Sequence, residues 1–142
     1  MSERAALAHL YRRAGFGARP EELDAAVKLG YAATVTMLLD RSRPDPGVAA
    51  TPPPALPLDA RPGKSADAAT RSAYQRAEAE AKNALVTWWL DRMVRAANPV
   101  PEKLALFWHG HFATSITKVG SAALMLRQNE CSGAWAPGTS RR

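Results

Sequence analysis

Prolines are distributed unevenly along this chain. Seven of the 11 prolines fall between residues 41 and 64. Each removes a backbone N–H donor and biases the preceding residue away from helix, so no regular helix is expected to cross this segment. We therefore expect helical segments on either side of a Pro-rich linker, residues 41–65. The prolines in question are Pro44, Pro46, Pro52, Pro53, Pro54, Pro57 and Pro62.

Residues 1–40, before the linker, carry apolar side chains at helical spacing in three short stretches. Pro20 fits the first position of the second stretch, with Glu21 and Glu22 in its first turn. Gly30 is a natural stop between the second and third stretches. This pattern predicts three short helices that pack on one another.

Residues 66–130 predict one long helix, about 66–97, followed by two shorter ones. The second half of the long helix is apolar over most of its circumference, which predicts that it is buried. Pro101 begins the next helix, and Ser121 is placed to cap the last one. The fold class is therefore all-α, an array of about five to six helices. Residues 131–142 show no periodicity and are expected to form a disordered tail.

Composition excludes several classes of protein. The 142 residues suit one modest domain. The net charge of +6 comes from basic residues scattered along the chain, without an aromatic RNA-binding pattern, so nucleic acid is not an expected partner. No apolar run approaches the length of a membrane span and no signal peptide is evident, which makes the cytoplasm the default expectation. No motif identifies a cofactor.

Two histidines stand out in the stretch FWHGHFAT, residues 107–114. On a regular helix, His109 and His111 point roughly 200° apart, so they do not share a metal ion there, and no metal site is predicted. A buried structural role, a catalytic or ligand-binding role, and metal binding with an unwound backbone remain open alternatives. The polar run RQNE, residues 127–130, would supply the rim of a site.

Two hypotheses follow from these residues. In the first, the full-length protein is an enzyme in which His109, His111 and Glu130 are catalytic, while Arg127 and Asn129 bind the substrate. In the second, the region is a helical scaffold or partner-binding module whose histidines are structural. The sequence does not name a reaction.

Three segments, taken in their order along the chain, resemble the sequences of a known family. They are HLYRRAGFG at 9–17, PEKLALFWHGHFATS at 101–115 and LMLRQNE at 124–130. Together they resemble the N-terminal portion of the bacterial domain-of-unknown-function 1800 family, over about residues 7–130. The resemblance implies a mostly helical protein, whose relatives are several times longer and in many cases exported. It implies no reaction, because the family has no agreed activity.

The tail after Glu130 departs from this pattern. If G/C-rich codons are assumed and one base is restored after Glu130, the tail begins Leu-Leu-Arg, which resembles the family continuation. We therefore hypothesise a one-base frameshift that leaves an N-terminal fragment; a short protein with a basic tail is the alternative. A fragment would expose apolar helix faces, so self-association is expected through Trp88, Trp89, Phe107 and Trp108.

Overall fold

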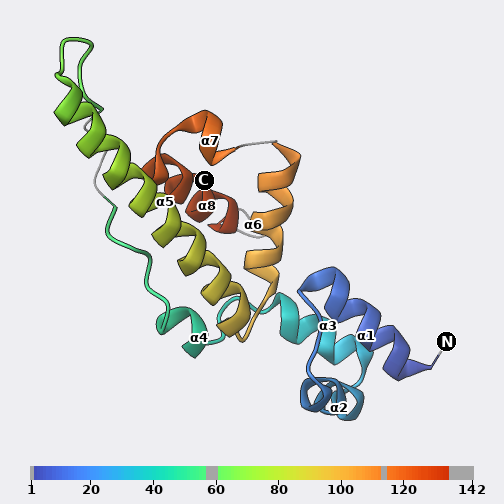
Figure 1. Ribbon diagram of the computed structural model, residues 1–142. Coiled ribbons are helices and arrows are strands. Elements are labelled where there is room, and N and C mark those ends of the chain that lie inside the picture. The colour runs from blue at the N-terminus through green and yellow to red at the C-terminus, as the bar shows by residue number, and fades with distance from the viewer. Residues whose placement is uncertain (1, 57–60, 113–114, 135–142) are drawn as a thin grey trace, which may run out of the picture.

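The computed structural model describes residues 2–56, 61–112 and 115–134. Those residues form eight helices and no strand, which confirms the all-α prediction (Figure 1). Six helices have nine residues or more, in agreement with the expected number, and two single turns were not expected. The helices are α1 (Glu3–Ala14), α2 (Pro20–Leu29), α3 (Tyr31–Leu39), α4 (Pro46–Ala49), α5 (Ala68–Arg95), α6 (Val100–His111), α7 (Ile116–Val119) and α8 (Ala122–Ala134).

Helices α1, α2 and α3 form a unit of their own at one end of the molecule (Figure 1). Its core is a cluster of buried side chains, Leu7, Tyr11, Ala26 and Leu38. Gly30 separates α2 from α3 with φ of 89°, a left-handed backbone that favours glycine, so the predicted stop is confirmed. We call α1–α3 the N-terminal unit.

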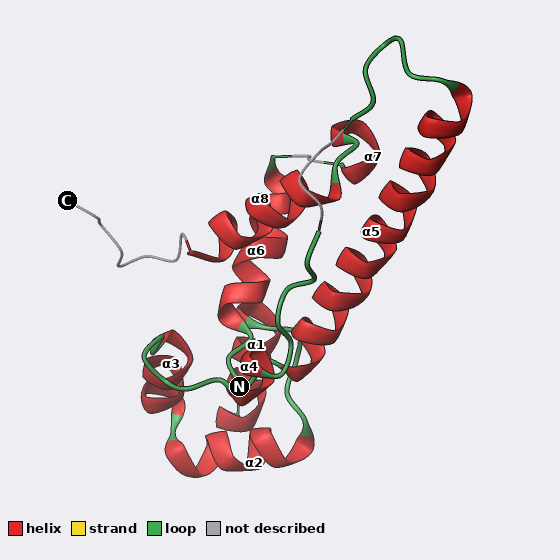
Figure 2. Ribbon diagram, turned by 90° about the vertical axis from the view of Figure 1, so that its left-hand side faces the viewer, coloured by secondary structure: helices red, strands yellow, loops and turns green. Residues whose placement is uncertain are grey.

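Helices α5, α6, α7 and α8, together with α4, form the second unit. Its core cluster is Ala81, Leu85, Ala122 and Met125, at the contact of α5 with α8. Asp67 caps α5 by accepting a hydrogen bond from the Thr70 amide at 2.6 Å. The first half of α5 extends beyond the neighbouring helices (Figure 2).

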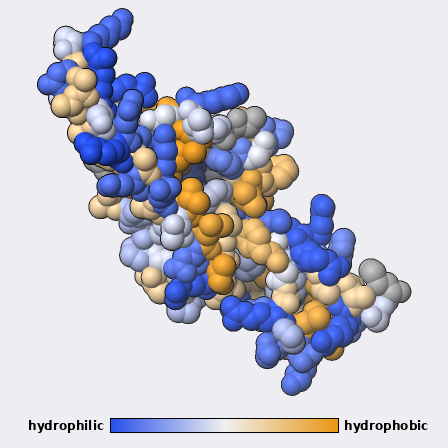
Figure 3. All heavy atoms as spheres, in the orientation of Figure 1, coloured by the Kyte–Doolittle hydropathy of each residue, from blue (hydrophilic) through white to orange (hydrophobic). Residues whose placement is uncertain are grey.

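The prediction that the second half of α5 is buried is wrong for one of its two apolar stripes. Leu85 is buried, but Val86, Leu90 and Val94, at helical spacing of four, are 50%, 58% and 70% exposed. The reason is that α4, α6 and α8 cover α5 from the side of Leu85 and leave the next stripe uncovered. Figure 3 shows a band of hydrophobic side chains across the middle of the molecule.

The Pro-rich linker is more structured than expected. It contains the one-turn helix α4, and Thr51 is buried. The indole N–H of Trp88 donates to the backbone carbonyl of Thr51 at 2.9 Å, which ties the linker to α5. Residues 57–60 of the linker lie outside the described residues.

The last helix is longer than predicted. α8 continues past Glu130 through Cys131 to Ala134, because Cys, Ser and Ala are tolerated in a helix and Gly133 weakens it by only about 1 kcal/mol. The rest of the expected tail, residues 135–142, lies outside the described residues. Within the described part of the chain, no helix is both long and apolar enough to cross a membrane.

Candidate functional site

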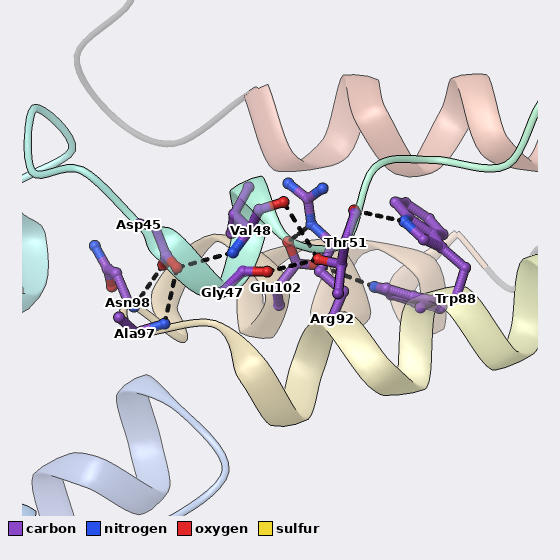
Figure 4. A network of polar contacts seen from close by, with 10 residues as sticks. Asp45, Gly47, Val48, Thr51, Trp88, Arg92, Ala97, Asn98 and Glu102 are labelled. Atoms are coloured by element: carbon purple, nitrogen blue, oxygen red, sulfur yellow. Dashed lines mark hydrogen bonds and ion pairs between the residues drawn. The ribbon is translucent and has the colours of Figure 1, made fainter.

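Asp45 joins the linker to the turn between α5 and α6. Its carboxylate accepts hydrogen bonds from the backbone amides of Val48 at 3.0 Å, Ala97 at 3.0 Å and Asn98 at 2.8 Å (Figure 4). Burial of the carboxyl raises the pKa of Asp45, but these hydrogen bonds to the charged form outweigh it, so the net pKa is lowered. Asp45 therefore both caps α4 and holds it against the turn between α5 and α6.

Glu102 is buried on α6 and is fully engaged by side chains of α5. Its carboxylate accepts from Arg92 Nε at 2.7 Å and from the indole N–H of Trp89 at 3.0 Å. The guanidinium of Arg92 also lies over the Trp88 ring, 5.4 Å from its centroid. The Arg92 charge and the additional indole donor together offset the cost of burying this carboxylate.

A cleft of about 630 Å³ has both Asp45 and Glu102 in its walls. The linker, α5, α6 and α8 each contribute to its walls, so residues far apart in sequence meet there. Its charged and amide side chains are Arg41, Arg43, Asp45, Arg92, Asn98, Glu102, Asn129 and Glu130. Asp45 and Glu102 are already engaged by donors, so Arg41 and Arg43 are the cations on the linker side of the cleft, and Glu130 is its third carboxylate.

Three of the five site residues predicted from the sequence lie at or next to this cleft. Asn129 and Glu130 line the cleft itself. Asn129 also lines a small cavity of about 100 Å³ together with His109. The His109 ring packs edge-on against Trp89, with ring centroids 5.6 Å apart. His109 thus shares a small cavity with Asn129 and does not line the cleft.

The other two predicted residues lie elsewhere. His111 is exposed at the end of α6, where its ring contacts Phe107, Trp108 and Phe112 at centroid distances of 5.9, 5.5 and 5.3 Å. Arg127 is exposed on α8 and lines neither the cleft nor the small cavity. The opposite directions of His109 and His111 follow from the regular α6 helix.

No group of three or more His, Cys, Asp or Glu side chains is placed to hold a metal ion among the residues that the structure describes. The donor chemistry of the cleft differs from that of a metal site, since arginines are prominent in it and its two engaged carboxylates already accept hydrogen bonds. The arrangement suits recognition of an anion.

The family model described as "Protein of unknown function (DUF1800)" matches residues 9–139. The chain belongs to this family. The match confirms the resemblance carried by the three motifs, and the matched span runs beyond Glu130. No curated protein and no solved structure matches the chain. The family description names no activity, so any function of this DUF1800 chain has to be argued from the geometry.

The sequence patterns missed the arginines of the cleft. In the sequence, Arg41 and Arg43 look like scattered surface charges, and Arg92 looks like one charged residue near the end of an apolar helix. One local signal was present: Asp45 followed by Pro46 is a typical N-cap and first position, which would have predicted α4. The contacts that bring the arginines together span tens of residues, and no local pattern encodes them.

Proposed function

We propose that this DUF1800 region binds a small organic anion in the cleft and that Arg41 and Arg43 hold the charged group. The observation that carries the proposal is that arginines from the linker and from α5 converge on one cleft, in which two of the three carboxylates, Asp45 and Glu102, already accept hydrogen bonds. A volume of about 630 Å³ falls in the range typical of small-molecule sites. Arginine suits this task because its planar donors match carboxylate and phosphate oxygens.

Other cleft residues have roles in this proposal. The Trp88 ring offers an apolar wall, and Arg92 above it is held by Glu102. Asn129 and Glu130 offer a polar edge that orients the ligand. His109 is a positioning residue, because it lines the small cavity that it shares with Asn129 and does not line the cleft. The geometry favours binding over acid–base catalysis by the two histidines, because neither lines the cleft.

The test is a calorimetric titration of the 142-residue protein with citrate and with inorganic phosphate at constant ionic strength. We expect saturable binding to the wild type and a loss of about tenfold or more in affinity in the Arg41→Gln/Arg43→Gln variant. Arg76→Gln, an exposed arginine in the first half of α5, is the matched control and should bind like the wild type. Equal affinities in all three proteins, or no binding at all, would refute the proposal.

A second candidate function is self-association of a helical scaffold, and the exposed aromatic end of α6 favours it. Phe107 and Phe112 are 57% and 62% exposed. Trp108 and Phe112 also border an apolar hollow of about 390 Å³ with Cys131 on α8. Exposed aromatic patches of this kind mark interfaces. We propose a second copy of this chain as the partner, with His111 as a structural member of the patch.

Sedimentation velocity over a range of protein concentrations tests this candidate. The wild type should shift to a dimer as concentration rises, and Phe107→Ser/Phe112→Ser should remain a monomer. Leu39→Ser changes an equally exposed apolar residue of α3 and should dimerise like the wild type. A wild type that stays monomeric at all concentrations rules the candidate out.

A further inference from the structure

A second, larger groove lies beside the cleft, between the N-terminal unit and the uncovered stripe of α5. Its volume is about 820 Å³. Apolar side chains dominate its walls, and among them are Leu29 and Met37 from the N-terminal unit and Leu90, Met93 and Val94 from α5. Leu90 and Val94 are the exposed residues whose burial the sequence predicted. The two methionines give the groove walls that adapt to a flexible apolar ligand.

The groove and the cleft meet at one residue. Arg43 lines both of them, and the turn after α5 contributes Asn98 to the cleft and Ala97 and Pro99 to the groove. An anionic group held at Arg43 would therefore have an apolar surface directly beside it.

The other charged side chains of the groove are Arg19 and Glu22. The carboxylate of Glu22 already accepts a hydrogen bond from the Arg19 backbone amide at 2.7 Å. Two arginines, Arg19 and Arg43, therefore line the groove together with one carboxylate, and Arg43 lies at the end shared with the cleft. Charge complementarity consequently favours a ligand with one negative end and a long neutral body.

We infer that the ligand is a single-chain amphiphile, a free fatty-acid-like carboxylate whose head lies at Arg41 and Arg43 and whose tail covers Leu90 and Val94. This inference deepens the proposed function and rests on it. The tail would remove from water the apolar stripe of α5 that no helix of the described chain covers. Burial of that stripe is the driving force for the tail, and the arginines select the head.

The first part of the test varies the length of the ligand's alkyl tail and keeps its carboxylate head constant. Butanoate, octanoate and dodecanoate are titrated into the 142-residue protein below the concentrations at which micelles form. Each methylene that the groove buries should strengthen binding by about twofold to fourfold. Dodecanoate should therefore bind roughly a hundredfold or more tightly than butanoate. Dodecanol, which has the same tail without the charge, should bind more weakly than dodecanoate.

The second arm separates head from tail with variants. Arg43→Gln should weaken all the carboxylates. Leu90→Ser/Val94→Ser should weaken dodecanoate at least tenfold and leave butanoate unchanged. Both positions are mostly exposed, so the double variant should fold, which circular dichroism checks. Leu124→Ser is the matched control, since Leu124 is an exposed apolar residue of α8 that lines neither the groove nor the cleft, and it should change neither affinity.

Each outcome supports or overturns the inference. Dodecanoate binding no tighter than butanoate overturns it, while citrate binding that depends on Arg41 and Arg43 would leave the proposed function standing. Dodecanol binding as tightly as dodecanoate overturns it as well, because the arginines would then play no part. Binding only to vesicles of phosphatidylglycerol, and not to free dodecanoate, would replace a soluble amphiphile with a lipid surface and refute it. If the wild-type protein binds neither citrate nor dodecanoate, the proposed function is refuted as well.

Discussion

The N-terminal unit buries large side chains at its centre, whereas the second unit buries mainly small ones. Leu7, Tyr11 and Leu38 fill the space between α1, α2 and α3, and Leu7 is fully buried. In the second unit, four of the buried apolar residues are alanines, which are Ala81, Ala105, Ala122 and Ala123. Because hydrophobic stabilisation scales with the apolar area removed from water, the two cores are not equivalent.

Small core residues let the helices of the second unit approach closely, but they leave its large side chains at the edge. Trp88 and Trp89 are half-buried, and Phe107 and Phe112 are mostly exposed. The unit compensates with hydrogen bonds between elements, such as Glu102 with Arg92 and Trp89. We therefore expect the N-terminal unit to depend chiefly on its core, and the second unit to depend in addition on polar contacts between its helices.

The largest expected effect comes from Leu7→Ala in the N-terminal unit. Removing a fully buried leucine should lower the free energy of unfolding by about 3 kcal/mol or more. Three of the four tryptophans, Trp88, Trp89 and Trp108, belong to α5 and α6, so tryptophan fluorescence reports chiefly on the second unit. In thermal unfolding, helix content measured by circular dichroism should fall first, with the fluorescence change later.

Leu39→Ala is the control for that experiment, because Leu39 is mostly exposed and its truncation should change stability by less than about 0.5 kcal/mol. If the circular dichroism and fluorescence signals change at the same temperature in the Leu7→Ala protein, the two units unfold together. Their stabilities then cannot be assigned to separate cores.

Gly47→Ala tests how closely the linker lies against the second unit. A Cβ at Gly47 would overlap the backbone carbonyl of Arg95, which is fixed at the end of α5, so α4 must move away. We expect a loss of about 2 kcal/mol in chemical unfolding, as for overpacking of a core.

Gly110→Ala is the same substitution at an open helical site, where a Cβ meets no atom within 4 Å. It should stabilise the protein by up to about 1 kcal/mol, because alanine is the better helix former. Equal effects of the two substitutions would show that α4 does not pack closely on α5.

Asp45→Asn probes the polar contacts that hold the linker, and its effect should depend on pH. The pKa of Asp45 is lowered in the folded state, so its stabilising contribution is fully present above its ordinary pKa of about 3.9 and is lost as the pH falls through the folded pKa. At about pH 7 we expect the variant to be less stable by about 1–2 kcal/mol, from weakened hydrogen bonds to a charged group.

Below about pH 4 the difference between the two proteins should shrink, because the wild-type carboxyl becomes protonated as well. Urea unfolding at a series of pH values measures it. A difference that stays constant down to about pH 3 would mean that the charge of Asp45 contributes nothing and that only its shape matters.

Local patterns predicted the features that depend on nearby residues. The stop at Gly30, the helix that carries FWHGHF and the opposite directions of His109 and His111 all follow from spacing and backbone preference. The predicted cap of the last helix is also present, since the Leu124 amide donates to Ser121 Oγ at 3.3 Å. These features need no knowledge of the tertiary structure.

The features that were missed depend on contacts between distant segments. Which stripe of α5 is covered is decided by where α8 and α4 pack, and α4 is placed by the bond between Asp45 and Asn98, 53 residues away. The cleft arises from the same contacts, so its arginines could not be assembled from spacing. The prediction of a site at RQNE led to Asn129 and Glu130, which line the cleft, and also to Arg127, which does not.

The smallest effect is expected for Ser121→Ala at the start of α8. Ser121 is almost fully buried, and its hydroxyl caps the helix, so truncation should reduce stability by about 1 kcal/mol. The neighbouring amide of Ala122 remains satisfied, because it donates to Glu78 Oε1 on α5 at 2.6 Å. Tryptophan fluorescence during urea unfolding measures the change in the second unit directly.

Glu78→Gln and the double variant complete a cycle around this helix start. If polar contacts hold α8 and each contact positions the other, either single variant already weakens both contacts, so the double variant should destabilise the second unit by less than the sum of the single changes. Additive effects would mean that the two contacts act independently. Small effects of both single variants would instead assign the attachment of α8 to Leu85 and Met125, and the second unit would then resemble the N-terminal unit in depending on its core.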